Sequence, residues 1–585
     1  MRGRREPTAQ VADASRIGPF LLAILWIYLG TGVTTNLSDY TSTAYVPIAL
    51  LQHGTFALGN YIPHAASVPY YIVQNIHHQF VSKSPVGAAL TALPFYIPYV
   101  VFGGSLAVGS VLFIQKVAAS LIMLVAIYLL WRLLSVLGTP NRIRWLVATL
   151  FGLGSENLSV ASQALWQHGP VELWMLVMIL IYVERWHLMD WGWWGLGLAG
   201  GMILLTRPPD LIVIAPLAIW IVAREWRKVR VEWLVAGAIL PLGFGALYNW
   251  WNFGSALATG YGSTTGYFAN PIGLGLLETL VSPSKGLFVY MPLAALVVAS
   301  VWRSVAHVKD WHDLEVPLGV SFVLGVLLYA AYYQWWGGYT FGPRYDADLM
   351  PVVCVLIGLV LTRSGRHPVS RWLQGPGRAA VILLVAWSVW WQLLGAYLTY
   401  GFAWNAAAIP SVNAIVPQAI WNIRDSELAY YWGSFTSLYS PAPWVGAARV
   451  RVKVTSPDVG KCSSRAICVV RVHAGASIPY TAVLTNASKA VLPSYRDATG
   501  LRVTFVDYRT SSQVGGKWLP TNGSGDLGQL LRPIAPGTSE RVYGMFAAPT
   551  GAGVYRVTFG AYQEGGERYK ALSTTTWVLT VTGTT

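Results

Sequence analysis

Residues 108–136 read VGSVLFIQKVAASLIMLVAIYLLWRLLSV, a run in which apolar side chains would cover every side of a helix. About 20 mostly apolar residues are enough for an α-helix to cross a bilayer. Arg132 lies near the end of this run, and Arg142 and Arg144 follow it. Basic residues beside a span favour the cytoplasmic side, so the stretch predicts a membrane-spanning helix whose C-terminal end faces the cytoplasm.

Similar apolar runs recur through the first 400 residues, and 54% of the chain is hydrophobic against 11% charged. This composition is typical of an integral membrane protein and argues against a soluble fold. We expect a polytopic α-helical membrane protein with about eleven transmembrane helices. The expected spans are approximately 17–35, 108–136, 142–159, 167–186, 190–206, 209–223, 232–253, 286–304, 314–335, 345–363 and 378–400.

The net charge of +15 would also suit a nucleic-acid-binding protein. The basic residues, however, occur in short clusters between the apolar runs, where the positive-inside rule places them. With a cytoplasmic N-terminus, alternation of the spans puts most of these clusters on one side. We therefore interpret the charge as a signal of membrane topology and not of nucleic-acid binding. The C-terminus is expected on the non-cytoplasmic side of an inner or plasma membrane.

Three long loops fall on the outer side. The first, residues 36–107, contains two apolar segments, 43–52 and 85–102, that we expect to form short helices along the membrane surface. The second, 254–285, is rich in Gly, Tyr, Ser and Thr, and the third, 334–344, reads QWWGGYTFGPR. Three irregular loops on one face predict a site there.

Near residue 446 the sequence pattern changes to an alternation of apolar and polar residues, interrupted by Gly, Pro, Asn and Ser. About seven short strands in residues 446–585 indicate an all-β sandwich domain, joined by a linker at 404–445 to a catalytic domain at 1–403. Basic residues outnumber acidic ones in this domain. Attraction to an anionic membrane or glycan and a merely solvated basic surface both remain open.

Cys462 and Cys468 flank a short loop in this outer domain, whereas Cys354 lies in an apolar span. A disulfide between the first two would suit an oxidising compartment, and two unpaired thiols are the alternative. Their spacing does not match a zinc site.

Asp39 follows the first span by about four residues, at the expected membrane boundary. A carboxylate that faces a partly protein-lined cavity there could act as a general base toward a hydroxyl acceptor. The alternative is an interfacial Asp that water solvates or that caps the next helix.

Lys83, Lys285 and Arg344 are nearly the only cations in the outer loops, and each lies beside Gly, Pro or Ser. A phosphate is commonly held by a cation and free backbone amides with little side-chain bulk nearby. Any one of them could instead extend its charge to the interface. Three on one face, where the positive-inside rule depletes cations, favour an anionic lipid or phosphate ligand.

Other outer residues offer further contacts. Arg207 lies at a helix end with Asp210 three residues on, so an internal ion pair explains it as well as a ligand does. His168, in WQHGP, is a candidate contact to substrate or metal, and Trp336 and Tyr345 are candidates for stacking on a sugar or for an interfacial aromatic belt. Asp346 and Asp348 are unusual directly after the Gly-Pro-Arg segment and could supply a second acid.

Together these segments resemble the GT-C class of membrane glycosyltransferases, which use polyprenyl-phosphate-linked sugars, and most closely the bacterial relatives of protein mannosyltransferases and aminoarabinose transferases. The similar passages lie at 39–40 with 49–54, 82–87 with 92–94, 166–170, 248–249 with 260–262, 282–288 and 336–345. The tail is similar to immunoglobulin-like domains of surface-glycan enzymes at 484–486, 536–537, 548–549 and 553–555.

The resemblance implies that Asp39 is the catalytic base and that Lys83, Lys285 and Arg344 bind the lipid phosphate. Many relatives carry paired acidic residues in the first loop, whereas Asp39 stands beside Asn36 and Ser38. A single carboxylate is a poor divalent-ion site, so we assign no metal ligand and no cofactor, although a divalent metal stays open.

The expected function is transfer of a sugar from a polyprenyl-phosphate donor to a hydroxyl of a glycan, lipid or protein acceptor, on the non-cytoplasmic face in cell-envelope glycan biosynthesis. No nucleotide-binding loop is present, and none is needed for such a donor. The alternative is a transporter or flippase of lipid-linked glycans, which would favour two related halves and polar residues near the bilayer midplane.

Overall fold

The computed structural model describes residues 7–32, 40–61, 71–262, 266–306, 314–363, 375–398, 403–408, 417–437, 445, 448–456, 467–495, 503–564, 566 and 568–582. These residues belong to two units. The first comprises Met1–Val281, Lys285–Gly337 and Gly342–Thr399, and the second comprises Ser282–Ser284, Gly338–Phe341 and Tyr400–Thr585. Two short pieces of the predicted outer loops therefore belong to the C-terminal unit.

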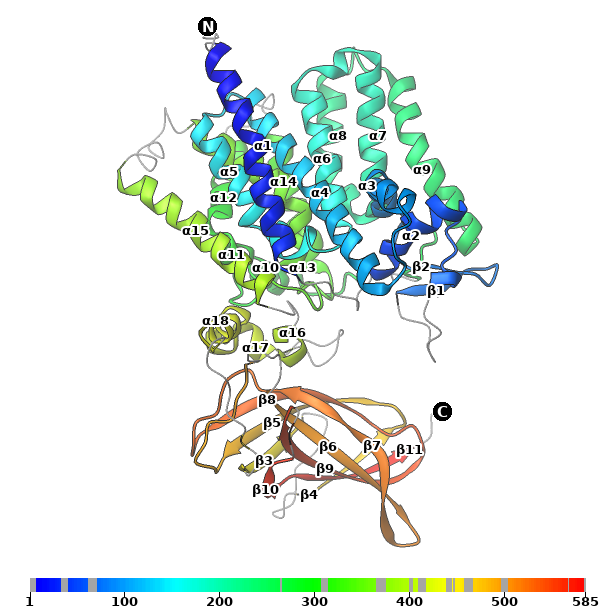
Figure 1. Ribbon diagram of the computed structural model, residues 1–585, viewed down its shortest axis with the longest axis vertical. Helices are drawn as coiled ribbons and strands as arrows, with labels where there is room; N and C mark the ends of the chain where they lie inside the picture. Colours follow the sequence, from blue (N-terminus) through cyan, green and yellow to red (C-terminus); the bar gives the residue numbers. More distant parts are fainter. Residues whose placement is uncertain are drawn as a thin grey trace. The chain divides into compact units, whose positions relative to one another are not determined.

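The first unit is helical apart from one hairpin, β1 (Ile72–Gln74) with β2 (Phe80–Ser82). Its first helices are α1 (Pro7–Gly30), α2 (Tyr40–His53), η1 (Gly59–Tyr61), α3 (Gly87–Val101), α4 (Val108–Val136), α5 (Asn141–Leu153), the π-helical turn η2 (Asn157–Ala161) and α6 (His168–Val183). They are followed by η3 (Trp186–Leu188), α7 (Asp190–Thr206), η4 (Pro208–Asp210), α8 (Leu211–Arg224), α9 (Val231–Phe253), α10 (Ile272–Val281), α11 (Leu287–Tyr290), η5 (Pro292–Ala294), α12 (Ala295–Ala306), α13 (Glu315–Ala331), η7 (Arg344–Leu349), α14 (Met350–Arg363) and α15 (Pro376–Tyr397). Figure 1 shows α6, α7, α8 and α9 running side by side.

Four stretches in the described part of the chain are long and apolar enough to cross a membrane: Val108–Val136, Val231–Phe253, Arg344–Thr362 and Pro376–Tyr397. Six further apolar helices have 10–17 residues. The predicted number of about eleven spans is wrong by this measure. Several predicted spans form single helices that are too short by this criterion, such as α6 with 16 residues and α13 with 17. At 286–304, Pro292 separates α11 from η5 and α12, because proline interrupts helical hydrogen bonding.

The first outer loop contains two helices at the predicted positions. Segments 43–52 and 85–102 correspond to α2 and α3, with the hairpin between them. Ala49, Ala89 and Tyr96 are fully buried in a small apolar core that the two helices share with α4. The loop is thus an ordered part of the helical unit over its described residues.

Helices α7 and α9 approach each other through glycines. A Cβ atom at Gly197 would overlap the carbonyl oxygen of Leu234, and one at Gly237 would overlap that of Trp194. Small residues at such positions allow two helix backbones to pack closely, as is common in membrane helix pairs. By contrast, a Cβ atom at Gly200, on the same α7, would meet no atom within 4 Å.

Gly237→Ala should therefore destabilise the helical unit by about 1–3 kcal/mol, because an added methyl group in a filled interface forces the backbones apart. Gly200→Ala is the matched control and should be neutral, or stabilising by up to about 1 kcal/mol because alanine favours helix. Thermal unfolding of both variants in the same detergent measures the difference. Equal midpoints would contradict the close packing of α7 on α9.

The segment predicted as a linker, 404–445, contains α16 (Ala403–Ala408), α17 (Pro417–Trp421), η10 (Ile423–Asp425) and α18 (Glu427–Ser437). Its residues contact the strands that follow. Arg532 forms an ion pair with Asp425, with 3.1 Å between Nε and Oδ1, and the Gln529 side-chain amide donates to the Tyr430 hydroxyl at 2.9 Å. Over its described residues this segment is helical and belongs to the C-terminal unit, where Asp425 and Tyr430 have partners on the strands.

The remainder of the second unit consists of two β-sheets on a shared core (Figure 1). The strands are β3 (Arg449–Thr455), β4 (Ile467–His473), β5 (Ser477–Asn486), β6 (Thr504–Val514), β7 (Lys517–Gln529), β8 (Ser539–Ala547), β9 (Gly553–Gln563), β10 (Lys570–Thr574) and β11 (Thr576–Thr582). In the described residues one sheet has the order β10-β3-β5-β8 and the other β4-β11-β9-β6-β7. Trp577 on β11 packs edge-on against Tyr480 on β5 and Phe546 on β8, which joins the sheets.

The period-two pattern located most strands because alternate residues are buried, as in β3, whose Val450, Val452 and Val454 point into the core. Two strands were missed. β7 contains Pro, Asn and three Gly and lies at a sheet edge, and β10 is short and exposed. Cys468 on β4 is disulfide-bonded and Cys354 is a free, buried thiol, while Cys462 lies outside the described residues.

Candidate functional site

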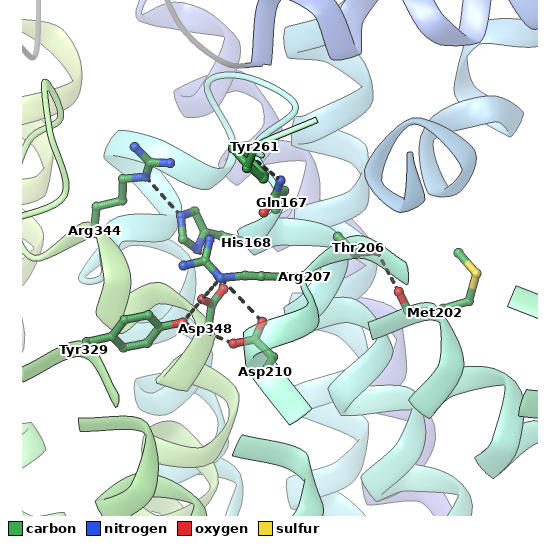
Figure 2. Close-up of polar contacts among 10 residues, drawn as sticks. All are labelled: Gln167, His168, Met202, Thr206, Arg207, Asp210, Tyr261, Tyr329, Arg344 and Asp348. Atoms are coloured by element: carbon green, nitrogen blue, oxygen red, sulfur yellow. Dashed lines mark hydrogen bonds and ion pairs between the residues drawn. The ribbon is translucent and has the colours of Figure 1, made fainter. Parts of the chain in front are cut away.

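Six polar side chains from four parts of the helical unit meet in its interior. We call them the buried polar cluster: His168, Arg207, Asp210, Tyr329, Arg344 and Asp348 (Figure 2). His168 begins α6, Arg207 and Asp210 lie at the turn between α7 and α8, Tyr329 is near the end of α13, and Arg344 and Asp348 belong to η7. Pro208 and Pro209 end α7 at this turn because they cannot donate helical hydrogen bonds.

Asp348 is the centre of the cluster and is completely buried. Its Oδ1 lies 2.7 Å from His168 Nδ1, and its Oδ2 lies 2.9 Å from Arg207 Nε. The Tyr329 hydroxyl donates to the same Oδ2 at 2.7 Å. A buried carboxylate is stable only when charge and hydrogen bonds compensate its lost hydration, and Asp348 has both.

His168 connects Asp348 to Arg344. Arg344 Nε donates to His168 Nε2 at 3.1 Å, so this ring nitrogen must be the acceptor. The proton of the imidazole then lies on Nδ1 and points to Asp348, which is the neutral tautomer. Arg344 also donates through Nη1 to the Gly337 carbonyl at 3.1 Å. Asp348 therefore sets the tautomer and orientation of the His168 ring, and the ring in turn orients the Arg344 guanidinium group.

Aromatic rings surround both guanidinium groups. The Arg344 guanidinium carbon lies 3.8 Å from the centre of the Trp166 ring, and that of Arg207 lies 5.3 Å from the centre of the Tyr345 ring. Tyr345 in turn stacks on Tyr329, with centroids 5.2 Å apart and planes 7° apart. Such faces attract cations and limit their side-chain motion.

The Tyr329 hydroxyl also determines the charge of Asp210. It lies 3.1 Å from Asp210 Oδ1, but its single proton already serves the nearer Asp348. A hydrogen bond to Asp210 then requires a proton on that carboxyl group. The cluster then holds two guanidinium groups against one ionised carboxylate.

A second set of contacts extends from His168 to the first two outer loops. Gln167, its neighbour, donates through Nε2 to the Tyr261 hydroxyl at 3.1 Å. Lys83 Nζ lies 5.8 Å from the centre of the Tyr261 ring, and the Ser84 hydroxyl is 3.5 Å from the Tyr261 hydroxyl. Lys83 is part-exposed. Residues from the first and second loops therefore lie beside the cluster.

Three more carboxyl side chains, those of Glu156, Glu172 and Asp346, are buried and interact electrostatically with Asp348 or with one another. Within the described residues, no group of three or more His, Cys, Asp or Glu side chains is arranged to hold a metal ion.

Four of the predicted site residues, His168, Arg207, Arg344 and Tyr345, come together at the cluster, and Lys83 lies near it. Lys285 and Trp336 are buried, at 1% and 3% exposed, but are not among the residues that define the cluster. Asp39 lies outside the described residues.

The sequence suggested an ion pair between Arg207 and Asp210. In the structure these side chains are 3.7 Å apart, and the shorter ion pair of Arg207 is with Asp348. Sequence reasoning noted Asp348 only as a possible second acid and did not single out Tyr329. The signal for Asp348 was present, since a carboxylate directly before an apolar helix must find a buried partner. Nothing in the local sequence distinguishes Tyr329 from the neighbouring tyrosines.

Comparisons with known proteins do not place the chain in a family. No family model and no curated protein matches it. Among solved structures, the sporulation control protein Spo0M from Bacillus subtilis is similar over 23% of this chain and 50% of its own, with 14% identity and a TM-score of 0.15. The alkylpurine DNA glycosylase AlkC from Pseudomonas fluorescens, bound to DNA with an abasic site analog, is similar over 64% of this chain and 96% of its own, with 13% identity and a TM-score of 0.14.

Proposed function

We propose that the chain is a GT-C-like membrane glycosyltransferase that transfers a sugar from a polyprenyl-phosphate donor to a hydroxyl acceptor. The observation that carries the proposal is the meeting of four sequence passages that are far apart in the chain. Lys83, Gln167 with His168, Tyr261, and Arg344 with Tyr345 all lie in or beside one cluster. These are passages on which the resemblance to such enzymes rests.

The surface of the helical unit supports a membrane location. Large apolar side chains point outward from α9, among them Ile239 at 60% exposed and Leu247 at 67% exposed. Trp26 on α1 is 81% exposed. Contiguous apolar surface of this kind would be costly in water and is favoured against lipid. The four long apolar helices are consistent with the same location.

The cluster suits an anionic group. Of the N–H groups of Arg344, Nε and one on Nη1 have acceptors within the described residues, and the side chain is only partly buried. The remaining N–H groups can bind two phosphate oxygens at once. Arg207 is already paired with Asp348, so the partly exposed Arg344 is the guanidinium group of the cluster whose charge would attract a phosphate.

In the proposed reaction, the bond between the sugar's anomeric carbon and the phosphate oxygen breaks, and the acceptor hydroxyl oxygen bonds to that carbon. The bonding electrons leave with the polyprenyl phosphate, whose growing negative charge Arg344 and Lys83 would stabilise. The hydroxyl proton goes to a base, for which Asp39 is the candidate from the sequence. Fixed donors that face a developing charge are among the strongest contributions to catalysis, and the chain Asp348–His168–Arg344 supplies such fixation.

The test is a transfer assay with purified protein in detergent or neutral-lipid vesicles and a panel of radiolabelled polyprenyl-phosphate sugars. We expect label to move from one donor to an envelope-glycan acceptor, and no transfer from nucleotide sugars. A companion measurement follows movement of lipid-linked glycan across the vesicle bilayer. Transbilayer movement without transfer from any donor would overturn the proposal in favour of a flippase.

A further inference from the structure

The outer face of the four-stranded sheet carries a row of cations. Residues Arg449, Arg451 and Lys453 occupy alternate positions of β3 and are exposed, while the valines between them are buried. Side chains two residues apart on a strand point to the same face about 6.7 Å apart. The three charges therefore form a straight line along the sheet.

Neighbouring strands extend this row sideways. Lys570 on β10 is the register partner of Arg449, and Arg541 on β8 pairs with Val483, which itself pairs with Lys453. Register partners in a sheet project to the same side, and both residues are exposed. Five cations thus share one face, which we call the basic face: Arg449, Arg451, Lys453, Arg541 and Lys570.

Within the described strands of this sheet, no carboxylate balances these cations on the basic face. In the described strands β3, β5, β8 and β10 the single acidic residue is Glu540, whose register partner Leu484 is buried. Glu540 pairs instead with Arg532 at 2.7 Å. The opposite sheet differs, because there Asp507 binds Arg568 at 3.0 Å and Arg556 lies over the Trp518 ring.

Hydroxyl groups fill the positions between the cations. Thr485 and Ser539 pair across β5 and β8 on this face, with their hydroxyl oxygens 2.8 Å apart, and Thr481 pairs with Thr455. Among the described residues of these strands, this face has no exposed aromatic ring for stacking bases, since Tyr543 is buried, and few large apolar side chains of the kind that enter a bilayer surface. Cations in line with interleaved hydroxyls match a chain of sugars that bears carboxylate or phosphate groups.

We propose that the basic face binds an anionic glycan and, resting on the proposed function, that this glycan is the acceptor. The charges would hold an extended polyanion along β3 while the hydroxyls exchange hydrogen bonds with sugar hydroxyls. Because every contact is solvent-exposed, binding should weaken as salt screens the charges.

The experiment measures binding of full-length protein, held in nanodiscs of neutral phosphatidylcholine, to fluorescent polygalacturonate, with neutral dextran as the uncharged control. The test variant combines Arg449→Gln, Arg451→Gln and Lys453→Gln. The matched control combines Arg471→Gln, Arg509→Gln and Lys517→Gln, three exposed cations on strands of the other sheet. Each triple removes the same charge and should leave thermal unfolding unchanged.

We expect polygalacturonate to bind and dextran not to, with about a tenfold or greater loss for the first triple and less than about a twofold change for the second. Equal losses in both triples would overturn the proposal, since general basicity would then explain binding. Binding to phosphatidylglycerol vesicles but not to polygalacturonate would overturn it in favour of a membrane surface. Binding is read without donor or transfer, so an intact glycan interaction in a protein that transfers no sugar would contradict the proposed function alone.

Discussion

Asp348→Asn should lower the efficiency of transfer by about 100-fold or more and destabilise the helical unit by about 3–5 kcal/mol. The amide keeps the shape of the side chain but removes the carboxylate that lies within 3 Å of both His168 and Arg207. Arg207 would then be a buried charge without adequate compensation, and the neutral amide would hold the His168 Nδ1 proton more weakly. Thermal unfolding and kcat/KM, measured on the same preparation, separate the two effects.

Asp210→Asn is the matched comparison for this variant. Asp210 is also fully buried and also contacts Tyr329, but it is already protonated in the arrangement derived above. An amide resembles a neutral carboxylic acid, so this variant should retain stability to within about 1 kcal/mol, the scale of one neutral hydrogen bond. A larger loss from Asp210→Asn than from Asp348→Asn would show that the charges are assigned to the wrong carboxylates.

Arg344→Ala should lower kcat/KM by about 100-fold to 1000-fold, the usual effect of removing one fixed donor from a developing charge. Arg344→Lys should recover little of this, because an ammonium group can neither bind two phosphate oxygens as a planar fork nor stack in the same way on Trp166. The control is Arg142→Ala, an exposed arginine on α5. It should leave kcat/KM within about twofold, as expected for a solvent-screened charge.

The measurement for Arg344 is kcat/KM for the donor, together with the donor concentration at half-maximal rate. Loss of donor affinity with Arg344→Ala and not with Arg142→Ala supports a phosphate-binding role. Unchanged donor kinetics in Arg344→Ala would remove this residue from the site and leave its contacts with His168 and Gly337 purely structural.

The fold was predictable where a single residue period dominates the sequence. The alternation of apolar and polar residues from Ala448 to Thr455 predicts a strand that differs from β3 by one residue, and residues 108–136 match α4. The predicted number of spans was too high because hydropathy does not show where a helix ends: α6 and α13 have only 16 and 17 residues, and Pro292 divides the run at 286–304. The strand β7 was not predicted because its Gly, Asn and Pro residues have low preference for strands. It is an edge strand that is stabilised by pairing with β6 and not by local preference.

The site was predictable as a set of residues but not as a network. Arg344 was predicted because cations are rare in the outer loops and it lies beside Gly and Pro, and His168 because its segment WQHGP offers a contact to substrate or metal. Their hydrogen bond joins residues 176 positions apart, and no periodicity encodes such a distance. The role of Asp348 likewise depends on three partners that approach it from α6, from the turn after α7 and from α13.

The C-terminal unit includes two short segments from the earlier part of the chain, 282–284 and 338–341, and this affects the order in which the protein folds during synthesis. Ser284 donates its hydroxyl proton toward the carbonyl oxygens of Ala419 and Ile420, at 3.2 Å each, and the Asn405 side chain donates to the carbonyl oxygens of Gly338 and Thr340. The hydrogen-bond partners of segments 282–284 and 338–341 are therefore synthesised about 65–135 residues after the segments themselves. Closing loops of that length comes late in folding because their entropy must be lost before the contacts form. The loops next to Lys285 and Arg344 would therefore be the last parts of the helical chain to reach their final conformation.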